Sequence, residues 1–275
     1  MRNIILLLLF MLAISACDNS ASKNNSVVSK TDFTQFVNPF IGTSKMGHVY
    51  PGATAPFGMV QLSPQTNFEA MLTDEGVYNT ETYTYCAGYQ YRDSTILGFA
   101  HTNFSGTGHS DLGDFLVMPT TGNLVLDPLK SEDGKKGFYS IFSHETEEAS
   151  PGYYKVDLNS YNIKAELTAS ERVGFHQYTF PESEEAHIVL DMMYNVYHHD
   201  NKNVWTFIRV ENDSVVTGYR QTNGWARTRK VFFAMQFSKP FKSYGHKKYC
   251  NASYDVFYSR FNHSLFIKGL ENPEN

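Results

Sequence analysis

Short apolar runs separated by turn residues recur along most of this chain, and they restrict it to folds built from β-strands. The runs cover residues 115–118, 152–158, 163–169, 173–180, 187–192, 205–210, 214–219, 231–237 and 264–267. Several alternate apolar and polar residues with a period of two, at a spacing of roughly 8–12 residues with Gly, Pro or Asn between them. No long stretch has helical periodicity. The pattern predicts an all-β, antiparallel β-sandwich, and residues 211–214 are predicted to be a hairpin turn.

Composition supports a folded domain. Hydrophobic residues make up 41% of the 275 residues and charged residues 19%, which is enough apolar material for a core and too little charge for disorder. Aromatic residues make up 15%, and flat side chains pack well on pleated sheets. The net charge of −5, without a run of Lys and Arg, argues against nucleic acid as the main partner.

The first thirty residues are predicted to lie outside the fold. Residues 1–16 have a basic start and an apolar run, residues 4–14, that is too short to span a membrane, as in a secretory signal. The sequence ISAC at residues 14–17 resembles a bacterial lipobox, which implies lipidation of Cys17; an ordinary signal peptide is the alternative. Residues 17–30 are predicted to be a flexible tether and residues 31–275 the domain. We therefore expect an exported lipoprotein, periplasmic or on the outer membrane, that contacts the membrane only through its lipid anchor.

The remaining cysteines have no recognisable pattern. Cys86 and Cys250 are 164 positions apart, so we expect two free, largely buried thiols.

The segment 38–114 differs from the rest of the chain, because it is rich in Gly, Pro, His and aromatic residues and lacks the regular spacing of strands. Such a loop-rich segment is predicted to be a functional surface more than a core.

Several motifs, in order, resemble those of one protein family. They are NPFIGT (38–43), GHVYPGA (47–53), PFGMVQLSP (56–64), GYQYRD (88–93), ILGFAHT (96–102), FSGTGHSDLGD (104–114), AELTASERVGFH (165–176) and GWA (224–226). Together they resemble the N-terminal domain of the family 92 glycoside hydrolases, which are bacterial exo-α-mannosidases. The similarity runs from about residue 36 to residue 269.

The resemblance implies a β-sandwich of the supersandwich type, followed in the family by an (α/α)6 barrel. The active site lies between the two domains, uses calcium and releases terminal α-linked mannose with inversion. An inverting pair of carboxyl groups stands roughly 6.5–9.5 Å apart. The family carries its general acid, its general base and most of its calcium ligands in the barrel, which this sequence lacks. No catalytic or metal-binding residue is therefore predicted here, and the expected partners are α-mannoside glycans and the C-terminal barrel.

The candidate substrate-binding residues are His48, Tyr50, Arg92, Asp93, His101, Gly106, Gly108, Asp111, Asp114 and Trp225. Imidazole, guanidinium and carboxylate groups can bond sugar hydroxyls, glycines permit close backbone approach, and an indole can stack on a pyranose.

Each candidate also has a structural interpretation. Tyr50 is equally compatible with burial, and an Arg92–Asp93 pair could only pin a loop. His101 could cap a turn, and Asp111 and Asp114 could support a loop from behind. Trp225 could instead contact a neighbouring domain.

Two other functions remain open at this point. A free-standing carbohydrate-binding surface lipoprotein would use the same residues without a catalytic partner. A structural interdomain scaffold would use Tyr50, Arg92 and Trp225 to contact protein.

Overall fold

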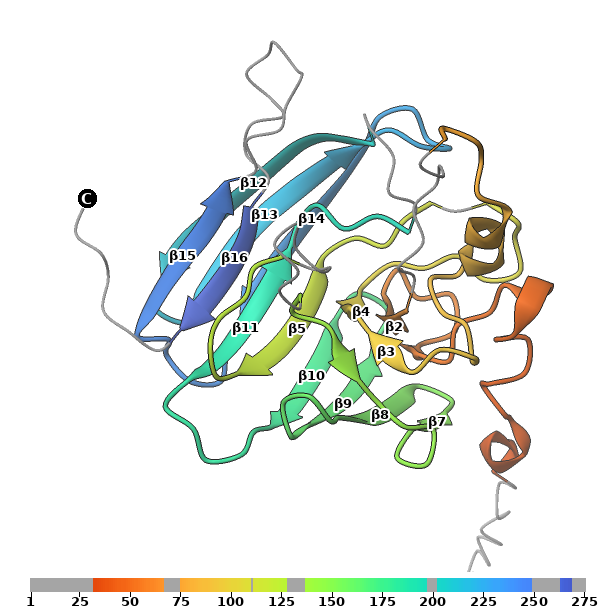
Figure 1. Ribbon diagram of the computed structural model, residues 1–275, viewed down its shortest axis with the longest axis horizontal. Helices are drawn as coiled ribbons and strands as arrows, with labels where there is room; N and C mark the ends of the chain where they lie inside the picture. Colours follow the sequence, from red (N-terminus) through yellow and green to blue (C-terminus); the bar gives the residue numbers. More distant parts are fainter. Residues whose placement is uncertain are drawn as a thin grey trace, which may run out of the picture. The chain divides into compact units, whose positions relative to one another are not determined.

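The computed structural model describes residues 32–66, 75–109, 111–127, 137–196, 202–248 and 263–268 (Figure 1). The chain divides into two compact units, Met1–Phe33 and Thr34–Asn275, and of the first only Asp32 and Phe33 are described. The predicted signal peptide, Cys17, the predicted tether and Cys250 lie outside the described residues. In the described ranges, no helix is long and apolar enough to cross a membrane.

Strands form most of the regular structure of the larger unit. Three short 3-10 helices occur, η1 (Phe33–Phe36), η2 (Lys45–Gly47) and η3 (Thr80–Tyr85). The strands are β1 (Ala53–Thr54), β2 (Gln61–Gln65), β3 (Thr95–Ile96), β4 (Gly98–Ala100), β5 (Leu116–Thr121), β6 (Ser140–Ile141), β7 (Glu148–Ser150), β8 (Tyr153–Leu158), β9 (Ile163–Ala169), β10 (Gly174–Thr179), β11 (Ala186–Asp191), β12 (Asn203–Asn212), β13 (Val215–Thr222), β14 (Arg229–Gln236), β15 (Ser243–Lys248) and β16 (His263–Lys268).

The strands pair into one large sheet and three smaller ones. The large sheet has the order β1-β2-β4-β5-β11-β16-β15, and the others are β10-β9-β8-β7, β12-β13-β14 and the ribbon β3-β6. Adjacent strands in each sheet are antiparallel. The predicted turn at residues 211–214 is confirmed as the connection between β12 and β13, where Asn212 Oδ1 accepts a hydrogen bond from Ser214 N at 2.9 Å.

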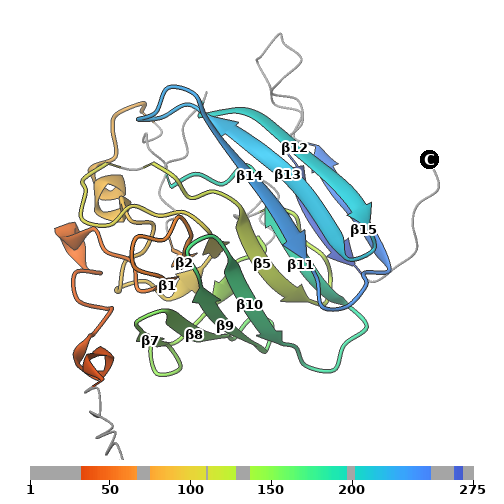
Figure 2. The same ribbon diagram turned by 180° about the vertical axis from the view of Figure 1, so that it is seen from behind.

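The four-stranded and three-stranded sheets cover the same face of the large sheet. Phe99 of β4 and Val117 of β5 are paired directly, so their side chains lie on one face. The Phe99 ring packs on Tyr154 of the four-stranded sheet, at 6.4 Å between centroids, whereas Val117 clusters with Val216 of the three-stranded sheet. The views from the front and from behind agree with this arrangement (Figures 1 and 2). The prediction of an all-β antiparallel sandwich is therefore confirmed.

Side-chain alternation explains why the four-stranded sheet forms. In β8 the residues Tyr154, Val156 and Leu158 are buried and their neighbours are only half buried, as the period of two in the sequence predicts. Burying side chains of this size stabilises a fold by about 1.5–3 kcal/mol each. Strand β9 repeats the pattern, and the two strands cover β1 and β2 with a continuous apolar face.

Residues 38–114 differ in part from the surface segment that the sequence predicted. They supply β2 and β4, and Leu62 and Phe99 of these strands are completely buried. Both strands are short, and Pro64 in β2 and Gly98 in β4 are residues that strand interiors disfavour, so the sequence pattern did not identify them. Cys86 is buried, as expected, and its Sγ lies 3.1 Å from the Tyr83 carbonyl oxygen.

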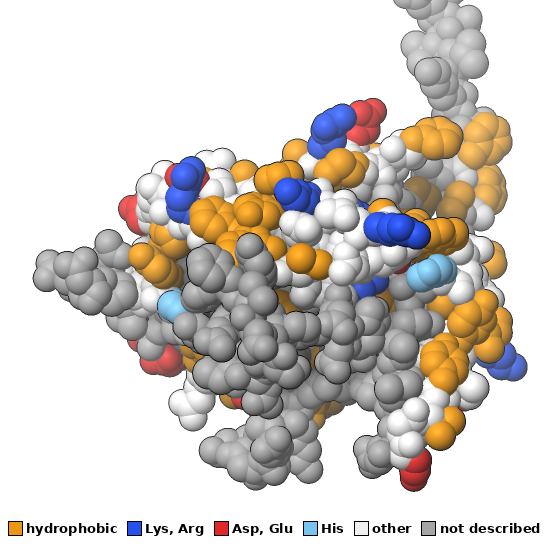
Figure 3. Space-filling view, turned by 90° about the horizontal axis from the view of Figure 1, so that it is seen from above, with side chains coloured by type: hydrophobic (Ala, Val, Ile, Leu, Met, Phe, Trp, Pro, Cys, Tyr) orange, Lys and Arg blue, Asp and Glu red, His pale blue; other side chains and the backbone are white. Residues whose placement is uncertain are grey.

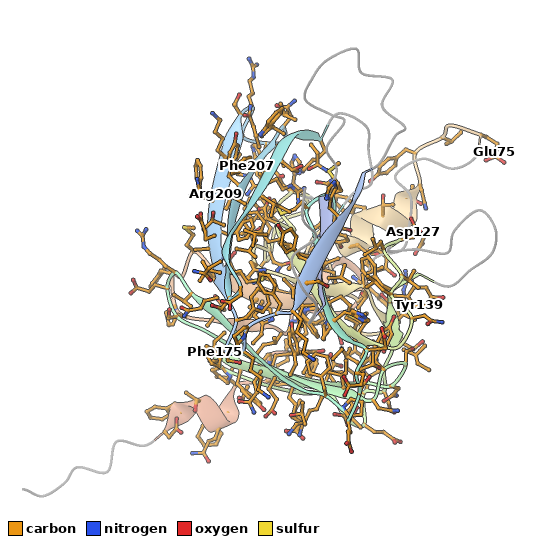
Figure 4. All side chains as sticks on the ribbon, turned by 90° about the vertical axis from the view of Figure 1, so that its left-hand side faces the viewer. Glu75, Asp127, Tyr139, Phe175, Phe207 and Arg209 are labelled. Carbon is orange, nitrogen blue, oxygen red and sulfur yellow. The ribbon has the colours of Figure 1, made fainter. Side chains whose placement is uncertain are left out.

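The outer face of the three-stranded sheet has an aromatic row. Phe207, Tyr219 and Phe232 are directly paired across β12, β13 and β14, with ring centroids 5.7 and 5.2 Å apart. Such cross-strand aromatic pairs stabilise a sheet by about 0.2–1 kcal/mol each. Figure 4 shows Phe207 and Arg209 of β12 on the same side of the domain as Phe175 of β10, opposite Glu75, Asp127 and Tyr139.

Candidate functional site

Trp225 is an exposed aromatic residue in the loop between β13 and β14. Its side chain is 61% exposed, and the His109 ring stacks parallel to it, with centroids 4.8 Å apart and planes 11° apart. Phe104 contacts the same indole edge-on at 5.9 Å. Figure 3 looks onto the end of the domain where this loop lies and shows hydrophobic side chains interspersed with Lys, Arg and His. The loop therefore presents an aromatic surface beside polar groups.

Asp111 fixes the backbone of this loop from below. Its Oδ2 accepts a hydrogen bond from Trp225 N at 2.9 Å, and its Oδ1 accepts one from Lys202 Nζ at 2.5 Å. Burial alone would raise the pKa of Asp111, but Lys202 and the backbone donors hold that pKa below its ordinary value. A Cβ at Gly224 would stand 2.5 Å from Asp111 Oδ2, so only glycine permits this approach.

Asp114 forms a second buried ion cluster. Arg229 donates from Nη1 at 2.5 Å and from Nη2 at 3.0 Å, and Thr102 Oγ1 donates at 2.6 Å. The completely buried guanidinium of Arg220 places its Nε 3.6 Å from Asp114 Oδ1. Burial would raise the pKa of Asp114, but the two arginines lower it below its ordinary value. Asp114 is therefore a charged partner of cations at neutral pH.

The two carboxylates position the loop instead of facing the solvent. Arg229 is the first residue of β14 and also lies 3.3 Å from the hydroxyl of Thr222, the last residue of β13. Asp114 thereby holds both ends of the loop that carries Trp225, while Asp111 holds its middle. No cluster of three or more His, Cys, Asp or Glu side chains suited to a metal ion occurs within the described parts of the chain.

His48 lies in a second loop that faces the glycine-rich segment 104–109. The residue has a left-handed backbone with φ of 51°, its carbonyl accepts from Gly106 N at 2.6 Å, and its ring meets Tyr83 edge-on at 5.1 Å. Its Nε2 is buried and has no hydrogen-bond partner among the described residues. A Cβ at Gly108 would lie 1.9 Å from the Tyr83 hydroxyl.

The predicted residues His48, Gly106 and Gly108 thus come together around Tyr83. His109 directly follows Gly108 in the chain, and its ring stacks on Trp225 of the β13–β14 loop. The exposed stacked indole and the exposed imidazole of His109 are groups that can bind a polyhydroxylated ring, whereas the imidazole of His48 is buried behind them.

Arg92 and Asp93 act mainly within their own loop. Arg92 Nη2 donates to Glu81 at 2.8 Å, and its guanidinium lies 5.8 Å from the centre of the Tyr85 ring. Asp93 accepts from the Tyr85 hydroxyl at 3.0 Å. Burial, followed by the charge of Asp93, raises the pKa of Tyr85 to about 12. These contacts fix η3, in agreement with the interpretation that the Arg92–Asp93 pair holds its own loop in place.

Tyr50 and His101 also make internal contacts. Tyr50 is half buried, and burial raises its pKa while its hydroxyl bonds to the Thr54 side chain. The imidazole of His101 lies between the sheets and bonds to the Phe115 carbonyl at 2.7 Å. Neither side chain belongs to the exposed surface around Trp225.

The site also contains residues that the sequence did not single out. Tyr83, His109, Lys202, Arg220 and Arg229 all contact a predicted residue. His109 lies within the motif at residues 104–114, so its position was a usable signal. Lys202, directly before β12, and Arg220, in the alternating strand β13, carried none, because nothing local shows that the fold buries both charges. The adjacent residues His198, His199 and Asp200 lie outside the described residues.

The chain is thus an all-β sandwich whose connecting loops present an aromatic surface, and buried ion pairs hold that surface in place. The model of the glycosyl hydrolase family 92 N-terminal domain matches residues 36–256, and the chain belongs to this family.

Solved structures agree with the assignment. A family 92 α-mannosidase from Bacteroides thetaiotaomicron, determined alone and in complex with mannoimidazole, is 37% identical over 87% of this chain, with a TM-score of 0.72. A second family 92 glycosyl hydrolase is 25% identical over 86% of the chain, with a TM-score of 0.63.

A sequence relative is also similar. A protein of Arthroderma benhamiae described as an uncharacterized secreted glycosidase is 28% identical over 160 residues, 55% of this chain.

The chain spans only part of each relative. It covers 30% and 31% of the two Bacteroides structures, 30% of the second hydrolase and 18% of the Arthroderma protein.

Proposed function

We propose that the chain is the sugar-binding N-terminal domain of an exo-α-mannosidase. In this proposal Trp225 and His109 contact α-linked mannose of glycans, and His48 supports the glycine-rich segment beside them, at an active site that a C-terminal (α/α)6 barrel completes. The observation that carries the proposal is the exposed indole of Trp225, whose backbone is held by a buried Asp111–Lys202 pair. A rigid aromatic face binds a pyranose with little loss of conformational entropy, which explains why a buried ion pair supports an exposed side chain.

Bond cleavage is assigned to the barrel and not to this chain. A general acid for an inverting hydrolysis must hold a proton near neutral pH. Asp111 and Asp114 have pKa values lowered by their cationic partners and are ionised there. The same partners occupy the oxygen atoms that calcium would need, so these residues do not fit a calcium site. The proposal therefore places calcium, the general acid and the general base in the barrel.

The proposed location is outside the cytoplasm, in the periplasm or on the outer-membrane surface, with a lipid anchor in the membrane. The secreted relative supports export, and the lipobox-like sequence at residues 14–17 supports a lipid on Cys17.

Purified residues 18–275 should release no mannose from α-linked mannobioses, with calcium or with a chelator. Measurement of free mannose checks this division of roles. Calcium-dependent release would overturn it, and Asp93, Asp111 and Asp114 would become the first carboxylates to mutate.

Trp225→Ala should weaken mannoside binding by about three- to tenfold, the equivalent of an aromatic contact worth about 0.5–1.5 kcal/mol. Binding of a non-hydrolysed mannoside can be measured by calorimetry on the protein that includes the proposed C-terminal barrel. Phe232→Ala is the matched control, because Phe232 is similarly exposed, at 66%, but lies on the outer face of the three-stranded sheet. Equal affinities of Trp225→Ala and the unmodified protein would reject the proposed contact and favour the structural scaffold. Full affinity in residues 18–275 alone would favour a free-standing binding protein.

A further inference from the structure

A continuous chain of hydrogen bonds crosses from the large sheet to the four-stranded sheet. His101, directly after β4, places its Nδ1 2.7 Å from the Phe115 carbonyl and its Nε2 3.0 Å from Nε2 of His176 on β10. His176 Nδ1 lies 2.6 Å from the hydroxyl of Tyr178, on the same strand. The two imidazoles thus join the layers of the sandwich.

The contacts determine the tautomer of each ring. Because a carbonyl only accepts, His101 Nδ1 carries hydrogen, and Nε2 of the neutral ring is then an acceptor. His176 Nε2 must therefore donate to His101, which leaves His176 Nδ1 to accept from the Tyr178 hydroxyl. All three bonds are satisfied at once when both imidazoles are neutral, and the donors run in one direction from Tyr178 to Phe115.

Added protons disturb this arrangement at both rings. A proton on His101 Nε2 forces His176 into its other tautomer, in which Nε2 accepts from His101 and Nδ1 donates to the Tyr178 hydroxyl, so the bonds reverse direction and a positive charge lies between the layers. A proton on His176 Nδ1 places a charge between the layers, and no described carboxylate forms an ion pair with either ring. The cost falls on the folded state alone, because both rings are solvated when the chain is unfolded.

The groups packed around the pair give little compensation. Gly174 of β10 lets His101 approach closely, since a Cβ there would stand 3.2 Å from the imidazole, 3.3 Å from Leu62 and 3.4 Å from Val60. The charged group that acts on His101 is Asp114, which favours the protonated form, but Arg229 and Arg220 already share that carboxylate. Burial, the largest influence, lowers the pKa of both His101 and His176.

The pair also touches the support of the candidate site. His101 N donates to the Asp114 carbonyl at 2.9 Å, and the adjacent Thr102 bonds the Asp114 carboxylate. We propose that His101 and His176 form an acid-sensitive latch that joins the two layers beneath the Trp225 loop, closed while both imidazoles are neutral and released as they take up protons. This inference does not depend on the proposed sugar-binding function.

The latch predicts a specific dependence of stability on pH. A free histidine has a pKa of about 6.5, and both folded values lie below it, so the unfolded chain binds more protons once the pH falls under about 6.5. The stability that the neutral pair contributes is complete above that pH and is lost below it. Each histidine lowers the folding equilibrium constant by up to about tenfold per pH unit there, and the pair by up to about a hundredfold.

Urea unfolding of residues 18–275 between pH 5 and pH 8 tests the latch. His176→Gln keeps an amide N–H donor but cannot titrate. Below about pH 6.5 the folding equilibrium constant of this variant should therefore fall less steeply than that of the unmodified protein, by up to about tenfold per pH unit. Gln177→His is the matched control, because it adds an exposed imidazole to the same strand and should leave the decline unchanged. Identical declines for the unmodified protein and His176→Gln would overturn the proposal.

Histidine NMR titration of the folded protein gives an independent result if His176→Gln fails to fold. Two imidazoles should remain neutral at pH values where exposed histidines are protonated, and Tyr178→Phe should shift the signals of one of them. Folded pKa values near 6.5 for both His101 and His176 would also overturn the proposal.

Discussion

Asp114→Asn should destabilise the domain by about 3–5 kcal/mol, because it removes one partner of a buried ion cluster. The amide cannot neutralise Arg220, which is completely buried, or accept both bonds from Arg229. An uncompensated guanidinium then remains in the core, and its desolvation is the source of the loss. The free energy of unfolding in urea measures the effect.

Glu81→Gln is the control for Asp114→Asn. It breaks the bond to Arg92 between two exposed side chains, and such a pair contributes about 1 kcal/mol or less. Arg220→Met in the Asp114→Asn background should recover part of the loss, since an apolar side chain needs no counter-charge. Equal losses for the Asp114 and Glu81 variants would contradict the ion cluster.

The contribution of Asp114 to stability depends on pH in a different range from that of the two histidines. Because the pKa of Asp114 is lowered, this contribution is lost only as the pH falls below about 3.9, so it does not overlap the titration of His101 and His176.

Glu147→Ala should cost about 3 kcal/mol or more, because several donors lose a single acceptor. The carboxylate is buried and accepts from the Tyr89 hydroxyl at 3.0 Å, from the Tyr154 hydroxyl at 2.7 Å and from His144 Nδ1 at 2.6 Å. Each buried donor left without a partner costs about 1–3 kcal/mol. These bonds join the loop before β3 to β8, so the variant should also loosen that loop.

Glu148→Ala is the matched control for Glu147→Ala. Glu148 is adjacent in sequence but exposed, and it pairs only with Lys155 at 2.7 Å among the contacts described for its side chain. We expect a loss of about 0.5 kcal/mol or less from this change. Urea unfolding of both variants tests the difference, and similar losses would show that Glu147 does not serve as the shared acceptor. Hydrogen exchange at Tyr89 reports the loosening of the loop.

Several features of the fold were predictable because they depend on local pattern. Alternation at residues 153–158 and 163–169 identified β8 and β9, and residues 211–214 identified the β12–β13 turn. The motifs around His48, Gly106 and Trp225 identified the loops of the site. The core strands β2 and β4 were not predicted, since both are short and contain Pro64 or Gly98, residues that strand interiors disfavour.

The partners of the charged residues could not be predicted. Lys202 lies 91 positions from Asp111, and Arg229 lies 115 positions from Asp114. No local pattern encodes such distant pairs, because they depend on which strands become neighbours. His101 belonged to a predicted site motif, but the packing of β10 against the large sheet turns it toward His176.

The antiparallel β-sandwich and the family were predictable from the sequence, because strand alternation, turns and ordered motifs are properties of neighbouring residues. The roles of Asp111 and Asp114 in bracing the Trp225 loop, and of His101 in joining the sheets, became evident only in the folded domain. The physical reason is that burial and pairing set the state of an ionisable group, and both depend on residues brought together from distant parts of the chain.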